Sequence, residues 1–540
     1  MTLKIDRRQL LQTGLLGLGA LATPGAAQLM TARGFTHDVA SGEPSADSVL
    51  LWTRYAGNDA ATRLGVEIAE DAEFGRVVSR GEAIARAARD HCAKVTLDGL
   101  DPGRRYFYRF RAPDGSFSPV GRTKTLPEGE VDRFAMAVFS CSNMPFGWFN
   151  GYAHAAARDD IDLVVHTGDY LYEYPVGNYP GPEQAVAGRD IAPDHEIVAL
   201  ADYWLRYSSY RADPDLQAVH RNFPMIARWD DHEIANNPWR DGAQNHQEDE
   251  GLWEARKRAA MRAYHDWMPV SDAPWDNYQI GNLATIFVPE TRLLGRDREL
   301  DYAVAQLTGS MQAGLENFRD GAWSDPSRTI LGGPQEAWLF DGLADSTARG
   351  TRWQVLAQQV IMGRSYFPTT IAEQLAAAAP DSIRQRLQLV QAASQAGLPI
   401  NLDAWDGYPA ARDRLLAAVL EADANLVVLS GDSHNGWAFD LHHGDDVAAG
   451  VEFAGHSVTS PGYESFLGQV PPDAMAAGLV AASPDMRWCD TSGRGYMTVT
   501  LTPDEARGEW LFVDTIRERS TTIARRHSMT AAHGARMVGG

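Results

Sequence analysis

Four short apolar runs, each followed at once by a tight turn with polar, metal-competent side chains, constrain this chain more than any other feature. The runs and the residues that follow them are 134–140 with Cys141, 161–167 with Asp169, 224–229 with Asp230, Asp231 and His232, and 425–430 with Asp432 and His434. A continuous apolar run of this length is typical of a strand buried on both faces. Because α/β folds place their sites at the C-terminal ends of strands, we expect these turns to meet.

The chemistry of these turns points to bound cations. A single Gly-Asp turn is typical of an ordinary Asx turn, but Gly-Asp-x-x-Tyr, Asp-Asp-His-Glu and Gly-Asp-x-His in succession are not explained by turn chemistry. A carboxylate such as Asp169 can bridge two cations, which activate a hydroxide and stabilise the oxygens of a phosphoryl group. Carboxylates suit Ca²⁺, Mg²⁺ or Mn²⁺, whereas a thiolate and a tyrosinate favour a stronger Lewis acid, for which Fe³⁺ fits best. The sequence therefore predicts a metal-dependent hydrolase of phosphate esters.

The overall charge restricts the partners of the chain. Its 540 residues carry a formal net charge of −22, and no basic stripe stands out that could bind nucleic acid. Positive charge for a small phosphate mono- or diester must then come from bound cations. No stretch after residue 30 is long and apolar enough to cross a membrane, so we expect no stable membrane insertion.

Residues 1–30 have the composition of an export signal. Paired arginines at Arg7 and Arg8 precede an apolar run at 15–22, and small residues follow at 25–27. This order is typical of a twin-arginine signal peptide. We expect the twin-arginine translocase to export the folded protein, which would make it periplasmic or secreted.

Residues 34–127 read as a small β domain. Short strand patterns at 48–54 and 94–97 precede a Pro-Gly turn and an alternating strand at 100–110. The Leu-x-Pro-Gly-x-x-Tyr run ending at Tyr106 resembles the tyrosine corner of fibronectin type III and immunoglobulin-like sandwiches.

After a linker at 126–130 the sequence pattern becomes that of an α/β domain. Strand patterns alternate with helical ones at 250–268, 334–345 and 371–396, which predicts a layered domain over 131–515. Residues 516–540 are basic and rich in glycine and alanine, and we expect a flexible C-terminal tail.

The order of the motifs resembles the alkaline phosphatase D family of calcineurin-like metallophosphoesterases. The matching segments are Thr-His-Asp-Val-Ala-Ser-Gly at 36–42, Phe-Ser-Cys-Ser-Asn at 139–143, Gly-Asp-Tyr-Leu-Tyr-Glu-Tyr at 168–174, Trp-Asp-Asp-His-Glu at 229–233, Asp-Ala-Trp-Asp-Gly-Tyr at 403–408, Gly-Asp-Ser-His at 431–434 and Ser-Pro-Gly at 460–462. The resemblance covers residues 34–515. It implies a four-layer αββα sandwich with an N-terminal β domain, twin-arginine export and a centre of one iron with one or two calcium ions; Zn²⁺, Mn²⁺ and Mg²⁺ stay open.

The resemblance also implies a ligand set. Cys141, Asp169, Tyr172 and His434 would hold the iron, and Asp169 would bridge to calcium, whose other ligands would include Asp432.

The rest of the calcium shell has two alternatives. A six-residue offset from carboxylate to amide fits either Asp230 with Asn236 or Asp231 with Asn237. We favour Asp231 and Asn237, because Asp231 occupies the position of the asparagine in the related Gly-Asn-His-Glu motif.

Three further residues have roles that the family pattern leaves open. His232 matches a histidine that faces the phosphate in the wider superfamily, and we place it with Asp169 and His434 in the catalytic set; it would bind substrate or assist the leaving group, or else hold the strand end. Glu290 stands where related sequences have aspartate before Thr-Arg, and would either pair with Arg292 or reach the site. His456 lies in a family-like loop, near the site or apart from it.

The expected function is that of an exported alkaline phosphatase and phosphodiesterase, which releases phosphate through a metal-bound hydroxide. A phospholipase D-like phosphodiesterase is the alternative within enzymes, since the family includes such activity. A non-catalytic extracytoplasmic binding protein is the alternative outside them. A non-catalytic protein would be expected to have lost some metal-ligand residues, whereas every matched ligand position is intact here.

Overall fold

The N-terminal part of the chain is a β-sandwich. In the computed structural model, which describes residues 31–302, 310–378 and 381–539, one sheet has the order β4-β3-β6-β7. Its strands are β3 (Ala61–Ala69), β4 (Val77–Arg86), β6 (Arg105–Arg111) and β7 (Gly121–Lys124). It packs against β1 (Gly34–Gly42), β2 (Val49–Ala56) and β5 (Cys92–Leu97), and the inward-facing residues of both layers form one apolar core.

The tyrosine corner is present in this sandwich. The backbone N–H of Asp101 donates a hydrogen bond of 2.8 Å to the hydroxyl of Tyr106, whose ring is buried. The bond ties the turn before β6 to the strand itself, as the Leu-x-Pro-Gly-x-x-Tyr pattern predicted.

The sandwich shares a sheet with the rest of the chain. β1 pairs in parallel with β10 (Pro224–Ala227), with Ser41 opposite Pro224 and Gly42 opposite Met225. The result is a ten-stranded sheet of order β23-β22-β21-β20-β8-β9-β10-β1-β2-β5. Its remaining strands are β8 (Phe134–Phe139), β9 (Leu163–His166), β20 (Gly495–Leu501), β21 (Glu505–Val513), β22 (Ile523–Ala532) and β23 (Val538–Gly539).

A second, seven-stranded sheet packs on the first. Its order is β13-β14-β15-β16-β18-β17-β19. The strands are β13 (Asp276–Ile280), β14 (Ala284–Val288), β15 (Trp353–Ala357), β16 (Leu426–Ser430), β17 (Gly436–His443), β18 (Val447–Ala454) and β19 (Met486–Asp490). Two-residue strands β11 (Pro238–Trp239) and β12 (Gly242–Ala243) form a separate small ribbon.

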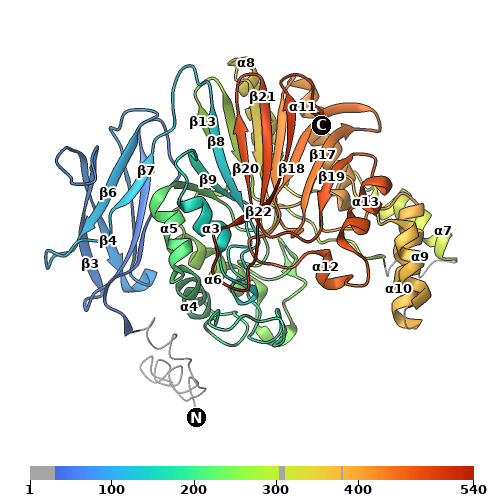
Figure 1. Cartoon of the computed structure of the whole chain (residues 1–540), viewed down its shortest axis with the longest axis horizontal. Helices are drawn as coiled ribbons and strands as arrows, with labels where there is room; N and C mark the ends of the chain where they lie inside the picture. Colours follow the sequence, from blue (N-terminus) through green and yellow to red (C-terminus); the bar gives the residue numbers. More distant parts are fainter. Residues whose placement is uncertain (1–30, 303–309, 379–380, 540) are drawn as a thin grey trace, which may run out of the picture.

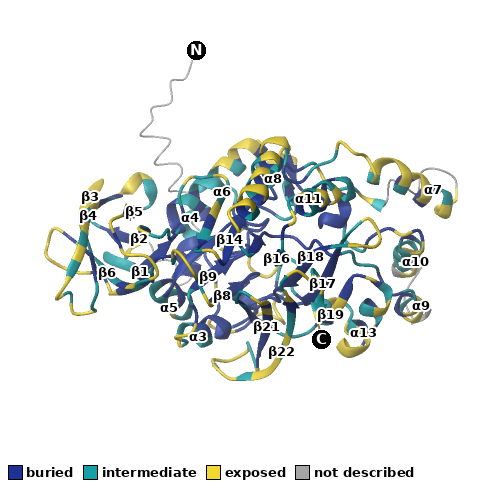
Figure 2. Ribbon diagram, turned by 90° about the horizontal axis from the view of Figure 1, so that it is seen from above, coloured by how far each residue is buried: buried dark blue, intermediate teal, exposed yellow. Residues whose placement is uncertain are grey.

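Helices cover the outer face of each sheet (Figures 1 and 2). Against the ten-stranded sheet lie α3 (Asn150–Ala156), α4 (Leu200–Arg211), α5 (Pro214–Asn222) and α6 (Trp253–Trp267). Against the other lie α8 (Gly333–Ala348), α9 (Thr369–Ala378), α11 (Pro409–Glu421) and α13 (Pro472–Ala482). α7 (Met311–Phe318) and α10 (Asp381–Gln395) pack together beyond them, and α12 (Tyr463–Phe466) is a single turn.

The continuous apolar strands are explained by these layers. On β8, Ala137 and Phe139 face the helices, whereas Met136 and Val138 face the core between the two sheets. Because successive side chains point to opposite faces, a strand with both faces buried needs apolar residues throughout. The molecule is therefore a four-layer αββα sandwich with the N-terminal β layers joined to one sheet.

The helical pattern expected at 371–396 is confirmed, since α9 and α10 cover its described residues up to 395. One expectation about the chain was wrong. Residues 516–540 are not a flexible tail, because β22 pairs with β21 over 505–513 and the ring of His527 stacks on Trp488 at 4.1 Å. Arg525 and Arg526 of β22 are exposed, and the backbone pairing of a strand close to the edge of a sheet does not need an apolar sequence.

The predicted export signal at 1–30 lies outside the described residues. Within the described part of the chain, none of the helices combines the length and the apolar character needed to span a bilayer.

Deleting residues 521–540 tests the assignment of the C-terminal strand. Loss of β22 exposes the edge of β21 and removes the stack on Trp488, so we expect the Tm to fall by at least about 2 °C, the low end of the shift that ~1 kcal/mol gives in a domain of ~150–250 residues. Differential scanning calorimetry of the full chain and the deletion variant measures it. An unchanged Tm would contradict the strand pairing and favour a flexible C-terminal segment.

Candidate metal centre

The candidate ligands stand at strand ends in an unusual backbone conformation. Cys141 follows β8, Asp169 follows β9, and Asp432 and His434 follow β16. These four and Asn237 have φ values of 59°, 55°, 61°, 62° and 45°, in the left-handed region that side chains with a Cβ disfavour. Strained conformations of this kind persist where the surrounding structure enforces them, and they gather at functional sites.

Two glycines let the turns approach one another closely. Gly168 has φ of 107°, and a Cβ placed there would lie 2.3 Å from the Cβ of Asp230. A Cβ on Gly431 would lie 2.6 Å from the Cβ of Ser140 and 2.7 Å from the hydroxyl of Thr167. The glycine of each Gly-Asp motif is therefore needed for contact between neighbouring strand ends.

One group of side chains combines sulfur, oxygen and nitrogen. Cys141, Asp169 and His434 each offer a ligand atom, and these atoms lie within 4.8 Å of one another. The Tyr172 hydroxyl joins them: it donates to Asp169 Oδ2 at 2.9 Å and lies 3.2 Å from His434 Nε2. His434 Nδ1 lies 2.8 Å from the carbonyl of Pro461, to which it donates, so that Nε2 offers its lone pair to the group.

Burial keeps the thiol, the phenol and the imidazole of this group neutral. Burial, and next the charge of Asp169, raise the pKa of the Cys141 thiol and of the Tyr172 hydroxyl well above their ordinary values. Burial lowers the pKa of His434 to about 3. A bound cation would reverse the first two shifts, because it stabilises thiolate and tyrosinate.

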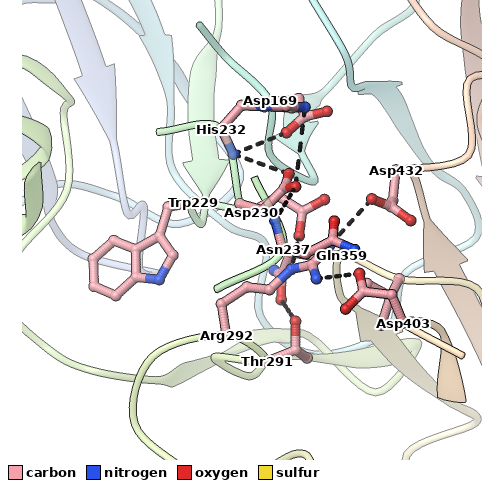
Figure 3. Close-up of polar contacts among 12 residues, drawn as sticks. Asp169, Trp229, Asp230, His232, Asn237, Thr291, Arg292, Gln359, Asp403 and Asp432 are labelled. Atoms are coloured by element: carbon pink, nitrogen blue, oxygen red, sulfur yellow. Dashed lines mark hydrogen bonds and ion pairs between the residues drawn. The ribbon is translucent and has the colours of Figure 1, made fainter. Parts of the chain in front are cut away.

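Two further groups are built from carboxylates and overlap the first. Asp169, Asp231 and His232 form one, and Asp230, Asp231 and Asp432 form the other. Asp169 links the first two groups and Asp231 links the last two, so the candidate ligands make a continuous chain. Figure 3 shows four of their members, Asp169, Asp230, His232 and Asp432. This is the arrangement in which one carboxylate can serve two cations.

The neighbouring aspartates 230 and 231 have different surroundings. Asp230 Oδ1 accepts a bond from the side chain of Arg292, whereas Asp230 Oδ2 is buried without a partner among the described residues. Asp231 accepts bonds from the backbone N–H groups of His232 at 2.9 Å and Asn237 at 3.0 Å. The six-residue offset from Asp231 to Asn237 is thus a direct contact.

The two asparagines also differ. The Asn237 side chain donates 3.0 Å to Glu299, which orients its amide, whereas the Asn236 side chain donates 3.0 Å to Gln244. The local geometry favours Asp231 with Asn237.

Arg292 belongs to this site, although the sequence motifs did not predict it as a site residue. Its guanidinium is fully buried and forms ion pairs with Asp230, Asp403 and, at 3.1 Å, Asp432. Arg296 forms a second pair with Asp403. Asp403 belongs to a family motif, but it lies 111 residues from Arg292 along the chain, so the sequence alone does not indicate that the two residues form an ion pair.

Glu290 does not reach the ligands. Its carboxylate accepts bonds from the indole of Trp229 at 2.8 Å and from the backbone N–H groups of Arg292, Leu293 and Leu294. The longer side chain thus fixes the backbone of the turn from which Arg292 points into the site.

Two glutamates hold the turns in register. Glu233 accepts bonds from the backbone N–H groups of Asp169, Tyr170 and Asp230, and burial raises its pKa to about 7. Glu173 accepts a bond of 2.7 Å from Nδ1 of His232, and this bond directs Nε2 toward Asp231, 3.9 Å away.

The other histidine and thiols lie apart from the groups described above. His456 Nε2 lies 3.2 Å from the carbonyl of Leu511, and its ring packs at a tilt of 34° against Phe512, with the centroids 4.4 Å apart. Cys92 and Cys489 are buried in separate apolar cores.

The donor set fits bound cations. Asp169, Asp230, Asp231 and Asp403 are buried and Asp432 is partly buried beside them, and two arginines and His232 supply less positive charge than these five carboxylates need. Asp230 Oδ2 is buried and has no hydrogen-bond partner among the described residues, and a bound cation would compensate it. The mixture of thiol, phenol, imidazole and carboxylate is a set of metal ligands.

Comparison with known proteins identifies the family. The profile described as PhoD-like phosphatase matches residues 136–510, and that of the PhoD-like phosphatase N-terminal domain matches residues 20–127. Alkaline phosphatase D of Bacillus subtilis (strain 168) is 33% identical over 559 residues, which cover 97% of this chain and 87% of the relative.

A solved structure titled "Structure of PhoD" superposes with a TM-score of 0.76 at 30% identity, covering 94% of this chain and 92% of that one. The match confirms the fold class expected from the sequence. The chain belongs to the PhoD-like phosphatase family and is a hydrolase of phosphoric esters.

Proposed function

We propose that this protein is an exported alkaline phosphatase and phosphodiesterase that releases phosphate from small esters outside the cytoplasm. The observation that carries the proposal is the continuous chain of three ligand groups, in which Asp169 and Asp231 are shared. Membership of the family supports the reaction class. The signal-like sequence at 1–30, with Arg7 and Arg8 before its apolar run, supports export by the twin-arginine translocase.

Iron would be held by Cys141, Asp169, Tyr172 and His434. A thiol and a phenol within reach of one carboxylate favour Fe³⁺ over a hard divalent ion, because both become strong anionic donors once deprotonated.

Calcium would be held by Asp169, Asp231, Asn237 and Asp432. Carboxylate and amide oxygens are the ligands that Ca²⁺ prefers. The contact between Asp231 and the backbone of Asn237 supports this pairing over Asp230 with Asn236.

When bound, the cations would supply Lewis acidity, offsetting the negative charge of the phosphoryl oxygens and of the nucleophile. The chain's own residues would position the carboxylates and protonate the leaving-group oxygen. His232 would deliver a proton from Nε2 to the leaving-group oxygen, while Glu173 holds Nδ1–H at 2.7 Å and keeps the ring in place. Arg292 would keep Asp230 and Asp432 at fixed positions.

Cys141→Ala tests the iron ligands. Loss of the thiol removes the softest donor, so we expect iron content to fall by at least tenfold and most activity with it. Plasma mass spectrometry and visible absorption of the tyrosinate–Fe³⁺ pair provide the readouts. Cys489→Ala, which removes a buried thiol elsewhere, is the control. Full iron in Cys141→Ala would show that the thiolate is not a ligand.

Asn237→Ala and Asn236→Ala form a matched pair for the calcium register. Removal of a ligand oxygen in Asn237→Ala should lower calcium affinity about 10–100-fold, a loss that even indirect supports of a metal site produce. Asn236→Ala should retain calcium. Calcium titration followed by calorimetry measures both. The opposite order would assign the site to Asp230 and Asn236.

A substrate panel tests the proposed reaction. We expect the metal-loaded protein to release phosphate from a soluble monoester and to cleave a soluble diester at alkaline pH, with little turnover of phosphatidylcholine vesicles. Phosphate release and choline release are measured side by side. Turnover of the lipid alone would instead favour a phospholipase D-like enzyme, and no turnover of any ester would refute the proposed function.

A further inference from the structure

Two tyrosines continue the loop of Tyr172 past the ligand groups. The ring of Tyr174 lies 5.3 Å from the ring of His232, at 59° between planes. Tyr179 packs edge-on against Tyr174 at 5.6 Å and also lies 5.9 Å from Tyr172. Both rings therefore adjoin the side of the centre on which His232 lies.

These rings are not core residues. Tyr174 and Tyr179 are half-buried, whereas Tyr170 and Tyr172 on the same loop are fully buried. The Tyr170 hydroxyl is bonded to His220 at 2.8 Å. Among the described residues, the hydroxyls of Tyr174 and Tyr179 have no hydrogen-bond partner, and neither is enclosed. Two partly exposed tyrosines with unpartnered hydroxyls therefore lie beside the group of Asp169, Asp231 and His232.

The loop backbone holds the two rings in place. The buried guanidinium of Arg206 donates to the carbonyl of Tyr174 at 3.2 Å and also to that of Tyr172. The side chain of Asn143 donates 3.3 Å to the carbonyl of Tyr179, and Phe146 supports the ring of Tyr179 edge-on at 4.8 Å. These contacts hold the loop that carries both rings, so that little ordering is needed when a ligand binds, and this lowers the entropic cost of binding.

We propose that Tyr174 and Tyr179 form a stacking shelf for a planar aromatic group esterified to the phosphate, such as a nucleoside or an aryl alcohol. The inference rests on the proposed function and names its substrate class. His232 shares a ligand group with Asp169 and Asp231, so an ester oxygen that receives its proton would place the leaving group beside Tyr174. With a net charge of −22 the chain suits small nucleotides better than polynucleotides.

Thymidine 5′-phosphate and 2-deoxyribose 5-phosphate test the shelf, because both lose the same primary alcohol oxygen and only one carries a base. We expect the wild type to prefer the thymidine ester. In Tyr174→Leu and Tyr179→Leu, which keep apolar volume without a ring, that preference in kcat/KM should fall about tenfold, the size expected when a base loses its stacking partner. The loss should appear mainly in KM, since stacking is equal in ground and transition states.

Matched variants separate stacking from general damage. Tyr174→Phe keeps the ring and should keep the preference, and so should Val176→Ala, an exposed change on the same loop. Iron content, measured in every variant, reports whether Tyr172 has been disturbed. 1-Naphthyl phosphate, which carries an aryl group without a sugar, shows whether the shelf accepts any planar group or a nucleoside only.

Three results would overturn the shelf alone, and a fourth would overturn it together with the proposed function. A proportional loss with both sugar phosphates would show that the tyrosines only support the centre. Equal wild-type activity toward both would show that the base is not bound. Turnover of phosphatidylcholine that falls in Val176→Ala but not in Tyr174→Leu would indicate an apolar lipid surface instead. A wild type that hydrolyses no ester would refute the proposed function itself, and the shelf with it.

Discussion

The arrangement of this site depends on how the structure compensates the mutual repulsion of its clustered carboxylates. Burial and, next, the charge of Asp231 raise the pKa of Asp169 well above its ordinary range, and burial raises that of Asp432 to about 6. Arg292 offsets part of the charge through three ion pairs. Removing one partner from such a buried pair typically costs ~3–5 kcal/mol, because the other charge is left uncompensated. Cations bound among these aspartates would supply the remaining positive charge, and they would also supply the Lewis acidity that phosphate ester hydrolysis needs.

The fold meets this constraint by bringing strand ends together with very little tolerance. Glu233 bonds three backbone N–H groups from two neighbouring turns, and Gly168 allows one of those turns to touch Asp230. Strained backbone at Cys141, Asp169, Asp432 and His434 aims these side chains at a common volume. The site is thus shaped by contacts between turns, and the two apolar sheets provide the rigid frame that holds them.

Much of this could be predicted from the sequence, because strand periodicity and turn composition are local properties. β8 and β16 follow from their apolar runs, and the tyrosine corner follows from the spacing of Pro102 and Tyr106. Arg292 could not be predicted, since its partners lie far away along the chain and only the folded sheets bring them together. The C-terminal strand β22 was missed for another reason: its backbone pairs with β21, and its outward side chains show no apolar pattern. The choice between Asp230 and Asp231 stays a proposal, which is supported by a contact from Asn237 to Asp231 that motif spacing alone does not give.

Anomalous X-ray diffraction at the iron edge, on crystals of metal-loaded protein with bound phosphate, tests the central claim most directly. The account predicts an iron peak among Cys141, Asp169, Tyr172 and His434, with calcium density between Asp169, Asp231, Asn237 and Asp432, and phosphate beside His232. A centre without iron, or a cation held by Asp230 and Asn236, would contradict it.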